Sequence, residues 1–130
     1  MNEIKVYCPT GKAAPMHDFL SSLDQRLRDK LLWQIFCLQR LSPCELREPH
    51  YKHFSLEKYS SLYELREKGK ILVRIIFTLE NGNIILLVPF VKRQPRDTMK
   101  ALEQSLRILS RIRASPEFLQ PFRFQSKDAT

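Results

Sequence analysis

The sequence predicts a small α+β domain in which helices pack on one antiparallel sheet. Three observations support this fold class. Apolar residues recur at helical spacing over 16–41, strand-like runs joined by tight turns follow over 62–93, and a second helical stripe occupies 97–112. An alternating run at the N-terminus adds one strand, so the expected order is strand, one or two helices, three strands and a helix.

The size and composition of the chain are those of one globular domain. It has 130 residues, 43% of them hydrophobic, and a formal net charge of +8. More than half of that charge lies in 92–130. Basic domains of this size often contact nucleic acid, an acidic protein or an anionic membrane surface, although a solvated helix face with a basic tail would also produce the charge.

The cysteines and glycines argue against several kinds of site. Cys8, Cys37 and Cys44 are odd in number and lack CxxC spacing, so neither a disulfide framework nor a zinc site is expected. Three glycines provide no glycine-rich phosphate loop, and we predict no metal and no cofactor. No run approaches the roughly 20 apolar residues of a membrane span, and no signal peptide is apparent. We therefore expect a cytoplasmic protein without membrane contacts.

The N-terminal part of the chain predicts a strand and then helix. Residues 4–8 alternate between apolar and polar, as in a strand with one solvated face. The apolar stripe over 16–41 predicts an amphipathic helix or two shorter ones. Asp18 or Ser21 could cap a helix start, and Ser42-Pro43 would end the helical region. The polar segment that follows, up to residue 60, predicts a functional or mobile loop with at most one short turn.

Three strands are expected over 62–67, 71–80 and 84–93. A turn at Gly69 joins the first two. Asn81-Gly82, which tolerates the positive φ angles of a type I′ turn, joins the last two. The last strand is apolar on both faces, which predicts a central position in the sheet.

The C-terminal part contains a proline, a helix and an aromatic tail. Pro89 predicts a bulge or an unpaired edge near the end of the last strand, because proline cannot donate to a ladder. Asp97-Thr98 would cap a helix that ends at about Ile112. Phe118 and Phe122 are expected to pack on the domain or on a partner.

Basic side chains interrupt the predicted sheet. Arg66 lies just before the first turn and Arg74 just after it, so the two guanidinium groups can face each other. Like charges at that separation need a carboxylate beside them or an anion between them. An internal network with Glu64 and Glu67 would supply the first, and a phosphate held by the guanidinium forks would be the second. Spacing alone leaves both alternatives open.

These strands resemble the RelE/HigB superfamily of bacterial toxins, in particular its phage-derived HigB-like branch. The resemblance covers 56–112 and rests on the motifs LYELR at 62–66, RIIF at 74–77 and FVKR at 90–93. It implies a twisted antiparallel sheet with helices packed on one face and a basic groove on the other.

The resemblance divides the chain in two and implies partners. A toxin domain would span 1–115, and a phenylalanine-rich extension 116–130. The partners implied are a cognate antitoxin, expected to be a helix-turn-helix DNA-binding protein that covers the basic groove, and the ribosome with its mRNA.

The activity implied is that of a metal-independent, ribosome-dependent mRNA endonuclease that arrests translation. The RNA 2′-OH would attack the adjacent phosphate, and arginines would stabilise the charge that develops on the phosphate oxygens. The implied catalytic residues are Arg66, Arg74 and Lys92. Further RNA contacts are expected from Arg93, Arg96, His50 and His53. Tyr63 points away from Arg66 and is interpreted as a core residue.

The chain departs from the branch at Val88-Pro89, where a His-Gly pair is common. That change removes a candidate general base, which His50 or His53 could replace if they are not simply solvated loop residues. The alternative is therefore a toxin without RNase chemistry, such as a ParE-like gyrase inhibitor, or a degenerate toxin fold that retains antitoxin binding. A basic structural or phage accessory protein is the third possibility.

Overall fold

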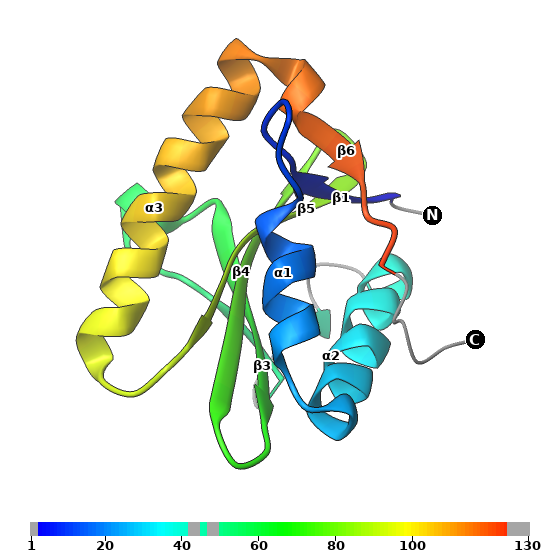
Figure 1. Cartoon of the computed structure of the whole chain (residues 1–130). Coiled ribbons are helices and arrows are strands. Elements are labelled where there is room, and N and C mark those ends of the chain that lie inside the picture. Colours follow the sequence, from blue (N-terminus) through cyan, green and yellow to red (C-terminus); the bar gives the residue numbers. More distant parts are fainter. Residues whose placement is uncertain (1–2, 42–44, 47–49, 125–130) are drawn as a thin grey trace.

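The computed structural model describes residues 3–41, 45–46 and 50–124. In this part of the chain, six strands form one sheet and three α-helices pack against it (Figure 1). The strands are β1 (Glu3–Tyr7), β2 (Tyr51–His53), β3 (Leu62–Lys68), β4 (Leu72–Glu80), β5 (Asn83–Val91) and β6 (Leu119–Pro121). The helices are α1 (Pro15–Ser22), α2 (Gln25–Cys37) and α3 (Pro95–Ala114). None of these helices has the length and apolar character needed to cross a membrane.

The strand order is β2-β3-β4-β5-β1-β6. All neighbours are antiparallel except β1 and β5, which run parallel. The small α+β class with a mostly antiparallel sheet is therefore confirmed. The parallel pair was not predicted, because alternation within one strand does not specify its neighbour.

The sheet buries apolar side chains on both faces, because adjacent residues of its central strands point in opposite directions. The α2-side core includes Val73, Ile75 and Phe77 from β4, together with the buried apolar residues of α1 and α2. The α3-side core includes Ile76 from β4 and Ile85 from β5. Figure 1 shows α3 on one side of the sheet and the α1–α2 pair on the other. The helices are thus divided between two faces rather than packed on one, as the two-faced apolar pattern of β5 requires.

The helical region over 16–41 is broken between α1 and α2. Asp24 caps α2, since its carboxylate accepts a hydrogen bond of 2.9 Å from the backbone N–H of Leu27. The expected caps were wrong, because Asp18 and Ser21 lie inside α1. The expected stop at Ser42-Pro43 lies outside the described residues.

The segment expected to be a loop contains the edge strand β2 and a 3₁₀ turn over Glu57–Tyr59. It also buries the aromatic residues Tyr51, Phe54 and Tyr59 against the sheet. The loop prediction was therefore wrong here. A strand of three residues is too short to show a recognisable alternation.

The β4–β5 hairpin follows the prediction, with one irregularity. Asn81 and Gly82 have φ angles of 51° and 76°, as a type I′ turn needs. The register then shifts between the pairs Ile76–Val88 and Phe77–Leu86, so that Leu87 is an extra residue and forms a bulge. Strict alternation would place Val88 with Leu86 in the α2-side core. Because of the bulge, Val88 lies in the α3-side core instead.

Helix α3 begins at Pro95, two residues before the predicted start. Asp97 still acts as a capping residue, but from within the first turn. One carboxylate oxygen accepts hydrogen bonds from the backbone N–H groups of Arg93, at 2.8 Å, and Gln94, at 3.0 Å. After α3, Phe118 packs edge-on to Tyr7, and Phe122 is buried in the α2-side core. The expected packing of these two phenylalanines is confirmed.

Substitution of Ile75 by alanine should reduce the free energy of unfolding by about 2–5 kcal/mol, because this side chain is fully buried in the α2-side core. Urea denaturation measures the change. The matched control is Ile71→Ala at a 36% exposed position, which should cost under about 1 kcal/mol. Equal losses in the two variants would contradict this description of the core.

Stability should depend on pH through Asp97. Its hydrogen bonds from the Arg93 and Gln94 backbone hold its pKa below the ordinary value, so its contribution is present above about pH 4 and disappears as the pH falls through the folded-state pKa. Wild type should therefore exceed Asp97→Asn in Tm near pH 6, and the difference should shrink toward pH 2. Thermal unfolding at several pH values measures it, and a difference independent of pH would exclude this role.

Candidate functional site

Two arginines face each other on the α3 side of the sheet. Arg66 of β3 is paired with Arg74 of β4, and Arg74 is paired in turn with Phe90 of β5. Directly paired residues lie on the same face, so the three side chains form a row across adjacent strands. The facing arrangement expected from the turn at Gly69 is confirmed.

A buried carboxylate lies between the two arginines. Glu64 is only 1% exposed, and its Oε1 accepts a hydrogen bond of 2.8 Å from Arg66 Nε. The same oxygen lies 3.5 Å from Arg74 Nε. We call Glu64, Arg66 and Arg74 the arginine cluster. Among these three side chains one negative charge stands against two positive ones, and the side chains of Arg66 and Arg74 are 21% and 12% exposed.

Arg74 is partly desolvated and has hydrogen-bonding capacity that the described residues leave unused. Burial lowers the pKa of the Arg74 guanidinium. The negative charge of Glu64 raises this pKa, and the positive charge of Arg66 lowers it further. An arginine nevertheless remains charged at any physiological pH. Its Nη1 donates to the carbonyl of Val73 at 3.3 Å. Its Nε is buried and makes no hydrogen bond to the described residues. An anion at the exposed part of the cluster could accept hydrogen bonds from the Arg74 guanidinium.

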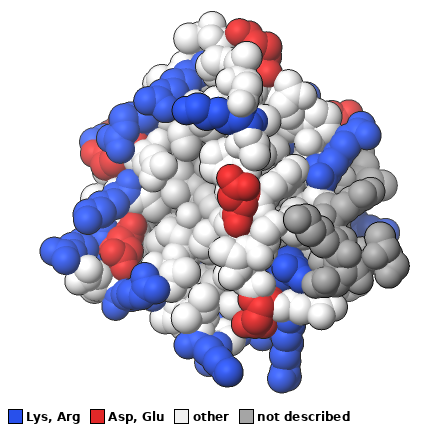
Figure 2. All heavy atoms as spheres, in the orientation of Figure 1, with Lys and Arg blue, Asp and Glu red and all other residues white. Residues whose placement is uncertain are grey.

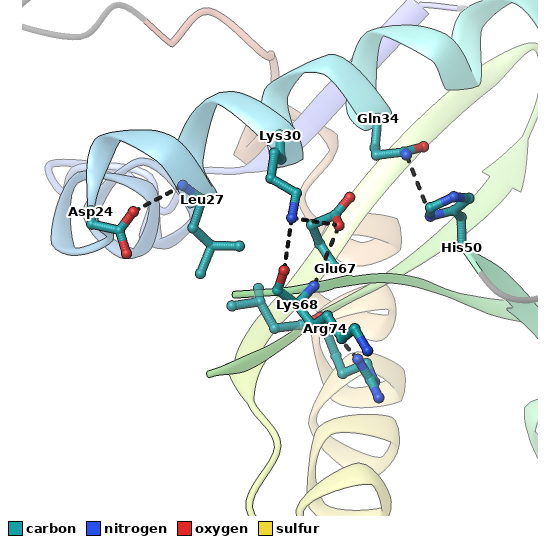
Figure 3. Close-up of polar contacts among 9 residues, drawn as sticks. Asp24, Leu27, Lys30, Gln34, His50, Glu67, Lys68 and Arg74 are labelled. Atoms are coloured by element: carbon teal, nitrogen blue, oxygen red, sulfur yellow. Dashed lines mark hydrogen bonds and ion pairs between the residues drawn. The ribbon is translucent and has the colours of Figure 1, made fainter. Parts of the chain in front are cut away.

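Glu67 does not belong to this network. It lies on the other face of β3, where its carboxylate is 3.4 Å from Lys30 of α2, and Lys30 also donates to the carbonyl of Lys68 at 2.8 Å (Figure 3). Arg74 lies on the side of the strands away from α2 in the same view. The internal-network alternative is therefore correct for Glu64 and wrong for Glu67.

Lysines extend the positive charge around the cluster. The backbone N–H of Lys92 donates to the carbonyl of Leu72 at 2.8 Å, which aligns Lys92 with the face that carries Arg74. Lys52 of β2 is paired with Glu64 and lies on the same face. The sequence did not indicate Lys52 as a site residue, because its strand was interpreted as a loop. Arg93 and Arg96 are exposed at the start of α3, close to Lys92 in the chain.

The two histidines expected near the arginines lie on the opposite face. The His53 ring stacks on Tyr63 with centroids 4.6 Å apart, and Tyr63 stacks on Phe77 of the α2-side core. His50 Nδ1 is 3.5 Å from the amide nitrogen of Gln34 on α2 (Figure 3). The backbone carbonyl of His50 accepts a hydrogen bond of 2.7 Å from the N–H of Arg66, but the imidazole rings of His50 and His53 are directed away from the arginine cluster. The assignment of Tyr63 to the core is confirmed.

Positive charge also covers the exposed face of α3. The exposed residues Lys100, Arg107 and Arg111 repeat at helical spacing along it. In Figure 2 positive side chains gather along the edge of the molecule where Figure 1 places α3, whereas the centre of the visible face is mainly uncharged. Phosphates of a nucleic acid backbone would be attracted to such a surface.

Removal of the charge on Glu64 should take away the carboxylate that Arg66 and Arg74 share. Glu64→Gln should lower the free energy of unfolding by about 3 kcal/mol, because a partly buried charge pair loses one partner. Added phosphate should raise the Tm of this variant more than that of wild type, since an anion beside the guanidinium groups offsets the positive charge that the carboxylate had balanced. Differential scanning calorimetry measures both effects. Glu80→Gln, which breaks the exposed pair with Arg113, is the control and should cost under about 1 kcal/mol.

The family of the chain is shown by a match over residues 18–109, which include the second part of α1, all of α2, the arginine cluster and most of α3. The family is described as Phage derived protein Gp49-like (DUF891) and is associated with toxin-like proteins. No curated protein sequence matches the chain. Because the matched segment is well over half of its 130 residues, the chain belongs to the phage-derived Gp49-like family.

Proposed function

We propose that this protein is the toxin of a type II toxin–antitoxin system of RelE/HigB type and that it acts as a metal-independent, ribosome-dependent mRNA endonuclease. Two observations support the proposal. The Gp49-like family is associated with toxin-like proteins. The arginine cluster, which carries the proposal, places two guanidinium groups around one buried carboxylate on an accessible sheet face.

The cluster is suited to a reaction at an RNA phosphate. The 2′-OH of one nucleotide loses its proton to water as its oxygen attacks the adjacent phosphorus, the bond to the 5′-oxygen of the next nucleotide breaks, and this oxygen takes up a proton from water as the cyclic phosphate forms. Arg66 and Arg74 stabilise the negative charge that grows on the phosphate oxygens, which is often the largest contribution to catalysis. Glu64 is a positioning residue, because its buried carboxylate contacts both guanidinium groups and holds them in place. Lys92 contributes charge from the end of β5.

The partners in this proposal follow from charge. The basic face of α3 and the exposed Arg93 and Arg96 dock on ribosomal RNA, so that binding weakens steeply with rising salt concentration. The cognate antitoxin, a helix-turn-helix protein, blocks the toxin by laying an acidic segment over Arg66 and Arg74.

The positions of the histidines favour a second candidate function. The imidazole rings of His50 and His53 contact Gln34 of α2 and Tyr63 and not the arginine cluster, and so neither ring is placed to act there as a general base. A toxin that binds a target without RNase chemistry, such as a gyrase inhibitor, or a toxin fold that retains only antitoxin binding would need no such base.

Substitution of either Arg66 or Arg74 by alanine should abolish growth arrest and reduce mRNA cleavage about 100- to 1,000-fold, because each removes a donor from the transition-state charge. Primer extension on a defined mRNA in a reconstituted translation reaction measures the cuts at the ribosomal A site. Arg113→Ala, in which the lost arginine pairs with Glu80 on the surface, is the control and should cut normally.

Two outcomes would contradict the endonuclease proposal. Full cleavage by a folded Arg66→Ala/Arg74→Ala variant would remove the cluster from the reaction. Intact mRNA with wild-type protein, combined with DNA damage in growth-arrested cells, would favour gyrase inhibition.

A further inference from the structure

A pocket of about 380 Å³ opens between the β2 segment and the start of α3. That volume lies within the range of about 300–1,000 Å³ that is usual for small-molecule sites. Its lining is largely aromatic and aliphatic. The residues that form it are Lys52, Phe54, Ser55, Leu56, Tyr59, Lys92, Pro95, Thr98, Met99 and Leu102. We call it the Leu56–Met99 pocket, after the two most exposed apolar side chains in its wall.

The pocket lies beside the arginine cluster. Lys52 is paired with Glu64 across β2 and β3, and Lys92 lies two residues after Phe90, the residue paired with Arg74. The two lysines of the pocket therefore flank the cluster on the same face of the sheet. Lys52 Nζ lies 5.5 Å from the centre of the Phe54 ring, a cation–π contact that holds this positive charge against the pocket wall.

The wall of the pocket combines exposed apolar side chains with a buried hydroxyl group. Leu56 is 63% exposed and Met99 47%, which is unusual for neighbouring apolar side chains beside buried Phe54 and Tyr59. The hydroxyl of Thr98 is buried and has no hydrogen-bond partner in the described part of the chain. A flat molecule with apolar faces and a polar edge would cover Leu56 and Met99 and could satisfy this hydroxyl.

We propose that the Leu56–Met99 pocket binds one unstacked nucleobase of single-stranded RNA whose adjacent phosphate rests on the arginine cluster. A nucleotide fits the chemistry because the apolar walls suit the faces of a base, and the lysines and arginines beside them suit its phosphate. An apolar side chain of a protein partner would use the walls but would make no ion pair with Lys52 and Lys92. The proposal rests on the proposed function, since it identifies the RNA-binding surface of the same site, and it assigns base selectivity to this pocket.

Methionine methyl groups provide a direct test. Met99 lies in the pocket, and Met16 is 2% exposed in the α2-side core, so Met16 serves as an internal control. Full-length protein with ¹³C-labelled methionine methyls is titrated with the four nucleoside 5′-monophosphates and with ribose 5-phosphate. Nucleotides should shift the Met99 resonance through the ring current of the base, and ribose 5-phosphate should not, while Met16 stays unchanged. The Met99→Leu spectrum assigns the signal. Equal shifts from nucleotides and ribose 5-phosphate would overturn the proposal.

Binding of short RNA separates this proposal from the proposed function. Fluorescence anisotropy at low salt compares a uridine pentamer with the same ribose–phosphate backbone lacking its bases. Wild type should bind the pentamer about 5- to 100-fold more tightly. Leu56→Ser/Met99→Ser should lose this preference. Trp33→Ser, which changes a 70% exposed side chain on α2, should keep it.

The remaining outcomes each have one meaning. Equal affinity of wild type for both oligomers would overturn the base pocket and leave phosphate binding by the cluster intact. A preference that survives in Leu56→Ser/Met99→Ser would also overturn it, and would leave those side chains to a protein partner. Failure of wild type to bind either oligomer would contradict the pocket and the RNA-binding surface of the proposed function together.

Discussion

The candidate site depends on one carboxylate that shares an oxygen between two guanidinium groups. Removal of Glu64 from water is costly, and the ion pairs with Arg66 and Arg74 compensate for that cost only while all three side chains keep their positions. The antiparallel register of β3 and β4 supplies those positions, because it sets Arg66 opposite Arg74 with Glu64 two residues away on the same face. The strand pairing and the electrostatics of the site therefore support each other.

The division of helices between two faces explains why this cluster remains accessible. Helix α3 covers the part of its face formed by Leu62, Ile76 and Ile85, and these residues lie toward the β4–β5 turn. The other end of the same face carries Arg66 and Arg74, which are not part of that core, and Phe90, which is partly buried and packs against it. On the opposite face α1 and α2 bury the sheet more completely. One face of the sheet thus carries the α3-side core at one end and the partly exposed arginine cluster at the other.

Much of this arrangement could be predicted from the sequence, and the parts that could not have physical reasons. Strand alternation and the Asn81-Gly82 turn are local signals, and they sufficed to place Arg66 opposite Arg74. The role of Glu64 was one of two open alternatives, since spacing cannot distinguish a carboxylate from a bound anion. Strand β2 was missed because three residues show no periodicity, and with it the neighbourhood of Lys52 and the true surroundings of His53 were missed. Side-chain direction in a loop is decided by packing, which the sequence does not display.

The bulge at Leu87 has a consequence for how β5 can vary. If the strand paired regularly from the Asn81-Gly82 turn onward, Pro89 would stand opposite Arg74, and Phe90 and Lys92 would point to the α2 side. The extra residue shifts the phase of everything after it by one position. Which side chains of β5 lie beside the arginine cluster therefore depends on whether the number of residues between the Asn81-Gly82 turn and that position is odd or even. An insertion or deletion of one residue in the second half of β5 would exchange the two faces there, whereas a change of two residues would preserve them. Natural length variation in this strand is expected to occur in pairs or to be offset by loss of the bulge.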